Sequence, residues 1–258
     1  MTVLQEIYNF WGITSKNIHN KEFTGYEPYY SQLDQFSKDT YEKDPETTIC
    51  SVFDIYRTVN LVPIIYYTKD GILDAIKEFK QSSYNSVSKG RINLGNNKGQ
   101  PLSRFLFPNM MTAEPKGRGH NSVRDRFYDD KKLKRAIRLC FEMREGNHLV
   151  YPTAIRRALE LVTGENVQNF KPQNARAIVE DLCPVMWGNV YDYSCGYGGR
   201  LLGIGSSNMK YNYIGIEPNT ETVKYLNFFN DCIDEAVGVR GTIVQSVSEE
   251  YQPTDIDL

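Results

Sequence analysis

The sequence has no apolar run long enough to cross a membrane. Its longest such stretch, residues 61–67, is far below the roughly 20 residues that a membrane helix needs. The N-terminus also lacks a basic segment followed by an apolar one, which argues against a secretory signal. We therefore expect a cytoplasmic protein.

Cysteine and histidine are scarce. The five cysteines stand at positions 50, 140, 183, 195 and 232, with no CxxC pair and no nearby histidine among the three histidines of the chain. This spacing favours neither a zinc site nor a disulfide framework. We expect reduced thiols and no metal.

Charge is distributed unevenly. The formal net charge is −2, yet residues 89–144 hold 14 Lys or Arg against five Asp or Glu, a local charge of +9. Residues 1–88 carry 8 basic and 12 acidic side chains, and residues 145–258 carry 8 and 15. A basic segment between acidic ones indicates an anionic partner, and nucleic acid is the commonest.

The spacing of apolar residues predicts two kinds of structure. Helical spacing predicts short helices at 4–11, 50–61, 70–82, 131–143 and 152–162, with a long loop over 83–122, which is rich in Ser, Asn, Gly and Pro. After residue 188, strands alternate with helices at 189–193, about 199 onward, 211–217, 220–236 and 241–246. This alternation predicts a parallel sheet with right-handed crossovers.

A glycine turn follows the first of these strands. Residues 190–205 read VYDYSCGYGGRLLGIG, so Asp192 ends the strand, and Gly196 and Gly198 permit positive φ and close approach of a ligand to the backbone. A carboxylate at Asp192 suits a cofactor with a cationic or amino end. Glu217 ends the next strand, where it can accept hydrogen bonds from both hydroxyls of a ribose.

These residues resemble the motifs of a known enzyme family. The turn looks like motif I of S-adenosylmethionine-dependent methyltransferases, its wording is similar to phage and bacterial amino-group DNA methyltransferases, and the upstream stretch NFKPQNA, residues 169–175, resembles their motif X. The resemblance implies S-adenosylmethionine as cofactor, with Asp192 and the glycine turn at its methionine, Glu217 at its ribose, and Pro218, Asn219 and Ser246 near its adenine. The implied cofactor site comprises Phe170, Lys171, Pro172, Asp192, Ser194, Gly196, Gly198, Glu217, Pro218 and Ser246.

The predicted fold is therefore α/β, a partial Rossmann-like methyltransferase sheet preceded by a mainly helical N-terminal domain. We expect the chain to divide into three regions: a helical region at 1–88, a basic loop and helix at 89–148, and the N-terminal half of the methyltransferase domain at 149–258. Alternatives remain for single residues. Phe170 is as consistent with a core aromatic as with a cofactor contact. Arg200 is predicted to be a surface or helix-end cation. Cys195 has no paired base in the sequence and is predicted to be a packing residue.

The catalytic motif of the resembled family is missing. Those enzymes hold a flipped base with a (Asp, Asn or Ser)-Pro-Pro-(Tyr or Phe) tetrapeptide, which is absent here; residues 107–109 and 217–219 come nearest. Residues 255–258 have the character of the strand before that motif. We expect a truncated polypeptide or half of a split enzyme, inactive alone. The strand bearing Asp192 would then present an open, apolar edge, for which we expect low stability, self-association, or coverage by the N-terminal helices or a second polypeptide.

The basic segment is predicted to contact DNA. Its cations are Arg91, Lys98, Arg104, Lys116, Arg118, Arg124 and Arg126. Flexible backbone would let them reach phosphates, and the interleaved Phe105, Phe107 and His120 could stack on bases. The alternative is a solvated loop that Leu106 and Phe107 anchor to the core.

The sequence is compatible with three functions. The first is a DNA amino-methyltransferase, with adenine N6 favoured over cytosine N4. The second is a non-catalytic module that keeps the fold to bind DNA or a protein partner. The third is methylation of RNA or a small molecule.

Overall fold

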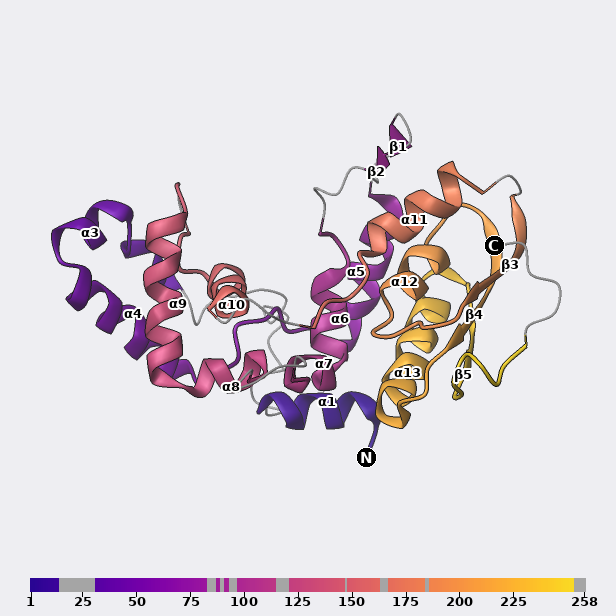
Figure 1. Ribbon diagram of the computed structural model, residues 1–258, viewed down its shortest axis with the longest axis horizontal. Coiled ribbons are helices and arrows are strands. Elements are labelled where there is room, and N and C mark those ends of the chain that lie inside the picture. Colours follow the sequence, from indigo (N-terminus) through magenta and orange to yellow (C-terminus); the bar gives the residue numbers. More distant parts are fainter. Residues whose placement is uncertain are drawn as a thin grey trace. The chain divides into compact units, whose positions relative to one another are not determined.

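The chain forms two compact units, each assembled from separate stretches of sequence. The computed structural model describes residues 1–13, 31–82, 87–88, 91–92, 97–114, 121–146, 148–162, 167–183 and 186–252 (Figure 1). Unit 1 comprises Met1–Ile7, Lys69–Phe107 and Gln168–Leu258, and unit 2 comprises Tyr8–Thr68 and Pro108–Val167. Unit 1 thus takes residues from all three of the ranges expected from the sequence, so the units interleave along the chain.

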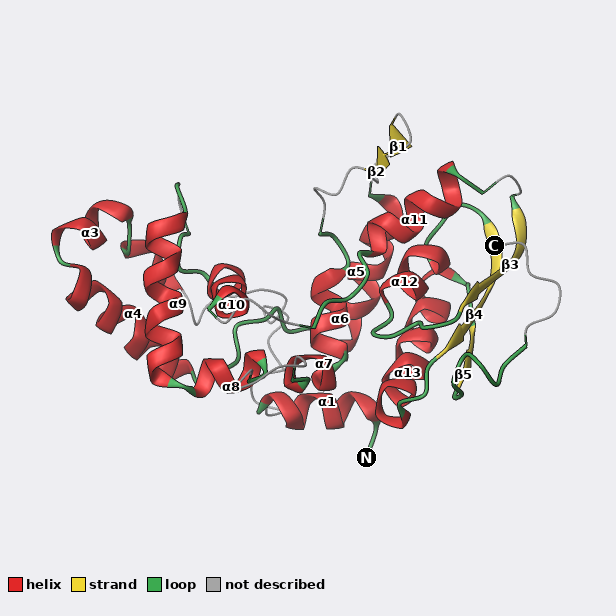
Figure 2. Cartoon of the chain, viewed as in Figure 1, coloured by secondary structure: helices red, strands yellow, loops and turns green. Residues whose placement is uncertain are grey.

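Unit 1 contains a three-stranded parallel sheet. Its strands are β3 (Trp187–Asp192), β4 (Lys210–Ile216) and β5 (Thr242–Val244), in the order β3-β4-β5 (Figure 2). The connections are α12 (Gly199–Gly205) and α13 (Thr220–Val237). The predicted alternation of strand and helix is confirmed, and the fold is mixed α/β.

One face of the sheet is more deeply buried than the other. Successive crossovers that step in the same direction place both helices on the same face, and Figure 1 shows α12 and α13 together beside the sheet. Val190 and Tyr213 point to that side and are buried, whereas Trp187 and Lys210 are exposed. Parallel sheets are usually covered on both faces. Among the described residues, β3 is a terminal strand of the sheet, in the order β3-β4-β5.

Three more helices complete the described core of unit 1: α5 (Lys69–Gln81), α6 (Gln100–Leu106) and α11 (Pro172–Asp181). Helix α5 packs against α13, and α11 packs against α12. A short antiparallel pair, β1 (Val87–Ser88) and β2 (Arg91–Ile92), precedes α6. The helix expected at 70–82 is confirmed, whereas α11 was not expected.

The long loop expected at 83–122 is wrong for part of its length. Residues 100–106 form α6 and residues 108–112 form α7 (Pro108–Thr112), separated by Phe107. Proline stands in the first turn of α6, where its missing N–H costs no hydrogen bond. Both helices are too short to show a helical period, and their apolar residues are buried.

Unit 2 is helical in its described residues. Its elements are η2 (Ser31–Gln35), α3 (Lys38–Lys43), α4 (Pro45–Val59), α7, α8 (Val123–Tyr128), α9 (Asp130–Met143) and α10 (Pro152–Leu161), together with the end of α1 (Val3–Trp11). Leu133, Ile137 and Phe141 form the buried side of α9, as its apolar spacing predicts. The buried Tyr56 on α4 donates its hydroxyl to the carbonyl of Val150 at 2.7 Å. No helix in the described part of the chain is long and apolar enough to span a bilayer.

Candidate functional site

The glycine turn joins β3 to α12 at the carboxyl edge of the sheet. Gly196 and Gly198 have φ of +55° and +72°, which confirms the positive φ expected for both. The two glycines differ in what surrounds them. A Cβ on Gly198 would lie 2.8 Å from Cδ1 of Phe229, so packing requires glycine there. A Cβ on Gly196 would meet only the Ser194 carbonyl, at 3.8 Å, so the backbone of Gly196 is accessible to a ligand.

The segment before α11 crosses the glycine turn. Asn169 donates its side-chain amide to the carbonyl of Tyr197 at 2.9 Å. A Cβ on Gly199 would overlap the carbonyl oxygen of Phe170, so the two backbones are in direct contact. Residues 169–171, which lie more than twenty positions before the turn in sequence, are therefore brought to it in space.

Asp192 is held by protein groups on both carboxylate oxygens. Oδ2 accepts hydrogen bonds from Nε of Arg200 at 2.7 Å and from the hydroxyl of Tyr213 at 2.6 Å. Oδ1 accepts from the backbone N–H of Ser194 at 3.3 Å. The sequence suggested that this buried carboxylate faces a cationic group of a cofactor. Its partners here are instead residues of the turn, of α12 and of β4, so Asp192 fixes the shape of the turn.

Arg200 is part of this site, although the sequence predicts a surface or helix-end cation. Its side chain is 28% exposed, it also donates to the Ser194 carbonyl, and its guanidinium carbon lies 5.2 Å from the ring centre of Phe170. Burial opposes its charge, but the hydrogen bond and negative charge of Asp192 outweigh burial and raise its pKa. Arg200 stays charged and links Phe170 to the turn.

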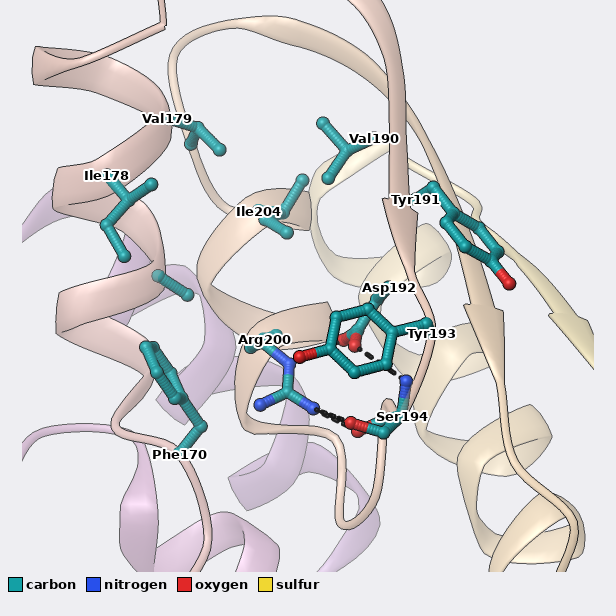
Figure 3. Close-up of a pocket in the computed structure, with 11 residues that line it drawn as sticks. Phe170, Ile178, Val179, Val190, Tyr191, Asp192, Tyr193, Ser194, Arg200 and Ile204 are labelled. Atoms are coloured by element: carbon teal, nitrogen blue, oxygen red, sulfur yellow. Dashed lines mark hydrogen bonds and ion pairs between the residues drawn. The ribbon is translucent and has the colours of Figure 1, made fainter. Parts of the chain in front are cut away.

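A pocket of about 300 Å³ lies between α11, β3 and α12. Figure 3 shows Arg200 between Phe170 and Ser194 and close to Asp192, with Ile178 and Val179 of α11 at the other end. Phe170 is 37% exposed and borders the pocket, so it is not a core aromatic. The pocket is lined by Phe170, Ala175, Ile178, Val179, Val190, Tyr191, Asp192, Tyr193, Ser194, Arg200 and Ile204. An apolar group with one hydrogen-bonding end fits this lining.

The carboxyl ends of β4 and β5 supply the other predicted residues. Glu217 is half-buried, its N–H donates to the Val244 carbonyl at 3.1 Å, and its Oε1 accepts from the N–H of Asn219 at 2.9 Å. Pro218 is exposed, and the hydroxyl of Ser246 donates to the Val247 carbonyl at 3.1 Å. Adjacent parallel strands therefore bring Asp192 and Glu217 to one edge, the usual ligand edge of such sheets.

Cys195 is a buried packing residue, as predicted. Its side chain is almost inaccessible, and burial, reinforced by the negative charges of Asp192 and Glu217, raises the pKa of its thiol to about 12. Because the nucleophile in cysteine chemistry is the thiolate, Cys195 is unsuited to nucleophilic attack at neutral pH.

We expect Cys195 to resist a thiol-specific reagent in the native protein at about pH 8, while the exposed Cys50 reacts. Its raised pKa contributes stability below pH 9.0, and that contribution is lost as the pH rises toward about 12. Mass spectrometry of the labelled protein checks this, with a Cys50→Ser variant as control. Native labelling of Cys195 as fast as that of Cys50 would contradict the burial.

Two expectations for the basic segment are wrong. Arg126 is fully buried in unit 2, where it donates to the carbonyl of Leu159 at 3.1 Å, so it is not available to a phosphate. Burial lowers its pKa. Phe105 and Phe107 are also fully buried and cannot stack on bases. Both rings pack within the core, a burial that depends on tertiary contacts and does not follow from the neighbouring sequence.

The other predicted DNA contacts are divided between the units. In unit 1, Lys98 is exposed, whereas Arg104 is half-buried and donates to the side chain of Gln100 at 2.7 Å. In unit 2, Arg124 is half-buried beside aromatic rings. Only the backbone of Arg91 is described, in β2. Lys116, Arg118 and His120 lie outside the described residues.

Comparisons with known proteins add no identification. No family model, no curated protein and no solved structure matches the chain. Within the described residues, no group of three or more His, Cys, Asp or Glu is arranged to hold a metal ion.

Proposed function

We propose that unit 1 binds S-adenosylmethionine at the carboxyl edge of its sheet, as the cofactor half of a methyltransferase for an exocyclic amine of DNA, with adenine N6 favoured. One observation carries the proposal. Residues 169–171, the turn at 192–198 and Glu217 come from three separate stretches of sequence and converge at this edge.

The residues present fit most of such a cofactor. The partly exposed carboxylate of Glu217 suits ribose hydroxyls, and the accessible backbone of Gly196 suits close approach of a ligand. Pro218 and Ser246 would border the adenine, and Phe170, Lys171 and Pro172 would enclose the other end. Asp192 fits less well as a direct ligand, because Arg200 and Tyr213 already occupy its Oδ2. We assign it the task of holding the turn.

When bound, S-adenosylmethionine supplies an electrophilic methyl group. The chain's own residues would bind and orient it: Glu217 by hydrogen bonding and the glycine turn by its shape. Transfer to a base amine also needs an acceptor for the amine proton and an aromatic ring against the base. The tetrapeptide that provides both is absent from these 258 residues. We therefore propose cofactor binding and assign the transfer step to no residue of this chain.

A non-catalytic module is the alternative. The observation that favours it is the closed network of Asp192, Arg200 and Tyr213, which satisfies the buried carboxylate without any ligand. A turn that is stable by itself can persist in a protein that has no need of a cofactor. Such a protein would use the fold to bind DNA or a protein partner.

We also propose a partner for the edge of β3, either a second polypeptide or another copy of the chain. In the described residues β3 is the terminal strand of the sheet, and a terminal strand can add a further strand. Met186 and Trp187 at its start are 69% and 74% exposed, which supports an apolar contact there.

Calorimetric titration with S-adenosylmethionine tests the proposed function. We expect binding by the unaltered protein and a loss of at least about tenfold in affinity for Glu217→Gln, because charge-assisted hydrogen bonds to the ribose are lost. Glu42→Gln removes the same charge at an exposed position on α3 of unit 2, outside the unit that holds these residues, and should bind normally. No binding by the folded, unaltered protein would reject the cofactor site in favour of the non-catalytic module.

A further inference from the structure

Unit 2 contains a pocket that the proposed cofactor site does not use. Its volume is about 760 Å³, and it lies where the end of α1, the end of α4 and helix α8 meet. It is lined by Asn9, Phe10, Trp11, Gly12, Gln32, Thr58, Val59, Asn60, Leu61, Arg124 and Tyr128. Among these described lining residues, Arg124 is the only charged one, so the wall of the pocket is positive.

Arg124 is held in this pocket by aromatic rings. Its guanidinium carbon lies 4.8 Å from the ring centre of Phe10 and 5.6 Å from that of Tyr128. It makes no hydrogen bond or ion pair with any described residue. The adjacent Asp125 accepts a hydrogen bond from the hydroxyl of Ser122 at 2.6 Å and does not neutralise Arg124. The guanidinium is thus oriented by its flat faces, while its N–H edge keeps its capacity to donate.

Such an arrangement is suited to an anionic group beside a flat one. A guanidinium presents a planar fork of donors that matches the oxygens of a phosphate. Tyr128 is 46% exposed and offers a ring face on which a base can stack. Asn60, exposed at the end of α4, and the exposed Thr58 add neutral hydrogen-bonding groups.

We propose that this pocket binds a nucleotide of single-stranded DNA, with a phosphate on Arg124 and its base on Tyr128. The inference rests on the DNA partner of the proposed function and assigns it to a particular place in unit 2. A single strand is favoured over a duplex because an exposed ring face stacks only on a base that has left its own stack. Neither group belongs to the cofactor site in unit 1.

Fluorescence anisotropy with a labelled single strand of about 12 nucleotides, measured on the full chain without S-adenosylmethionine, tests the inference. Arg124→Gln should weaken binding by about fivefold to tenfold and reduce the slope of log Kd against log salt by about one, because one phosphate contact is lost. Arg124→Lys should bind the strand more weakly than the unaltered protein but more tightly than Arg124→Gln, since a lysine keeps the charge but not the planar fork of donors. Tyr128→Leu should weaken binding without changing the salt slope.

Arg240→Gln is the matched control. Arg240 lies in unit 1, its side chain is 63% exposed, and it pairs with Asp231, so its loss changes the net charge equally. Equal affinities and salt slopes for Arg124→Gln and Arg240→Gln, with both variants folded by circular dichroism, would overturn the inference. Failure of the folded, unaltered protein to bind the strand would overturn it too. Calorimetry with S-adenosylmethionine, expected to be unchanged in Arg124→Gln, separates this failure from a failure of the cofactor site.

Discussion

Replacing Arg176 with methionine is expected to lower the free energy of unfolding by about 4 kcal/mol. Arg176 on α11 and its partner Glu180 are each 4% exposed and pair at 3.1 Å. Arg176 also donates to the backbone carbonyls of Phe79, Lys80 and Ser82, at 3.1, 2.9 and 3.2 Å, where α5 ends. The substitution leaves a buried carboxylate without its cation and removes donors from three carbonyls.

Urea denaturation, monitored by circular dichroism, measures this loss of unfolding free energy. Arg157→Met is the matched control, because the Arg157 side chain is 54% exposed, and its ion pair with Glu160 should contribute less than about 1 kcal/mol. The double variant Arg176→Met with Glu180→Leu should recover part of the stability, since no uncompensated charge remains buried. A loss in Arg176→Met no larger than that in Arg157→Met would show that Arg176 does not hold α5 to α11.

The second large effect is expected for Gly203→Ala in α12. A Cβ at this position would overlap the carbonyl oxygen of Pro172 and lie 2.6 Å from Cβ of Ala175. The obstacles belong to the start of α11 and cannot rotate away, so the helices must separate. We expect a destabilisation of about 3 kcal/mol, despite the gain of roughly 1 kcal/mol in helix propensity that alanine brings.

Gly205→Ala in the same helix provides the comparison. Its Cβ would lie 3.1 Å from Cγ2 of Ile233, so Ile233 would have to move by only a few tenths of an ångström. The same denaturation experiment should show a much smaller change. Similar losses of stability for Gly203→Ala and Gly205→Ala would mean that the position of both glycines near the end of α12, and not the contact between α11 and α12, determines the effect.

The sequence predicted the sheet of unit 1 well because its signals are local. Strands of three to seven residues alternate with glycine turns and helices, and positive φ at Gly196 and Gly198 follows from their place after a strand. The same holds for α5 and α9, where apolar residues recur on one side of a long helix. Helices α6 and α7 were not predicted, because neither completes enough turns to show a helical period of apolar residues.

Charged residues were harder to place than strands. Arg126 and Arg200 both looked like solvent-facing cations, because a basic side chain is usually exposed. Arg126 is buried by the packing of α8 against α10, and Arg200 is drawn to Asp192 by the turn between them. Both outcomes depend on partners that only the fold brings near. The joining of residues 169–171 to the glycine turn was predicted, but only through a resemblance and not through spacing.

The interleaving of the two units limits how the protein can be divided. The chain passes from one unit to the other after Ile7, Thr68, Phe107 and Val167. A fragment that starts near residue 149 would omit α5 and α6, and with them the buried Phe79 and Phe107 that pack in unit 1. Gene fragments cut at the edges of the recognisable motifs should therefore aggregate or be degraded in the expression host, whereas a circular permutant that keeps every segment retains both cores.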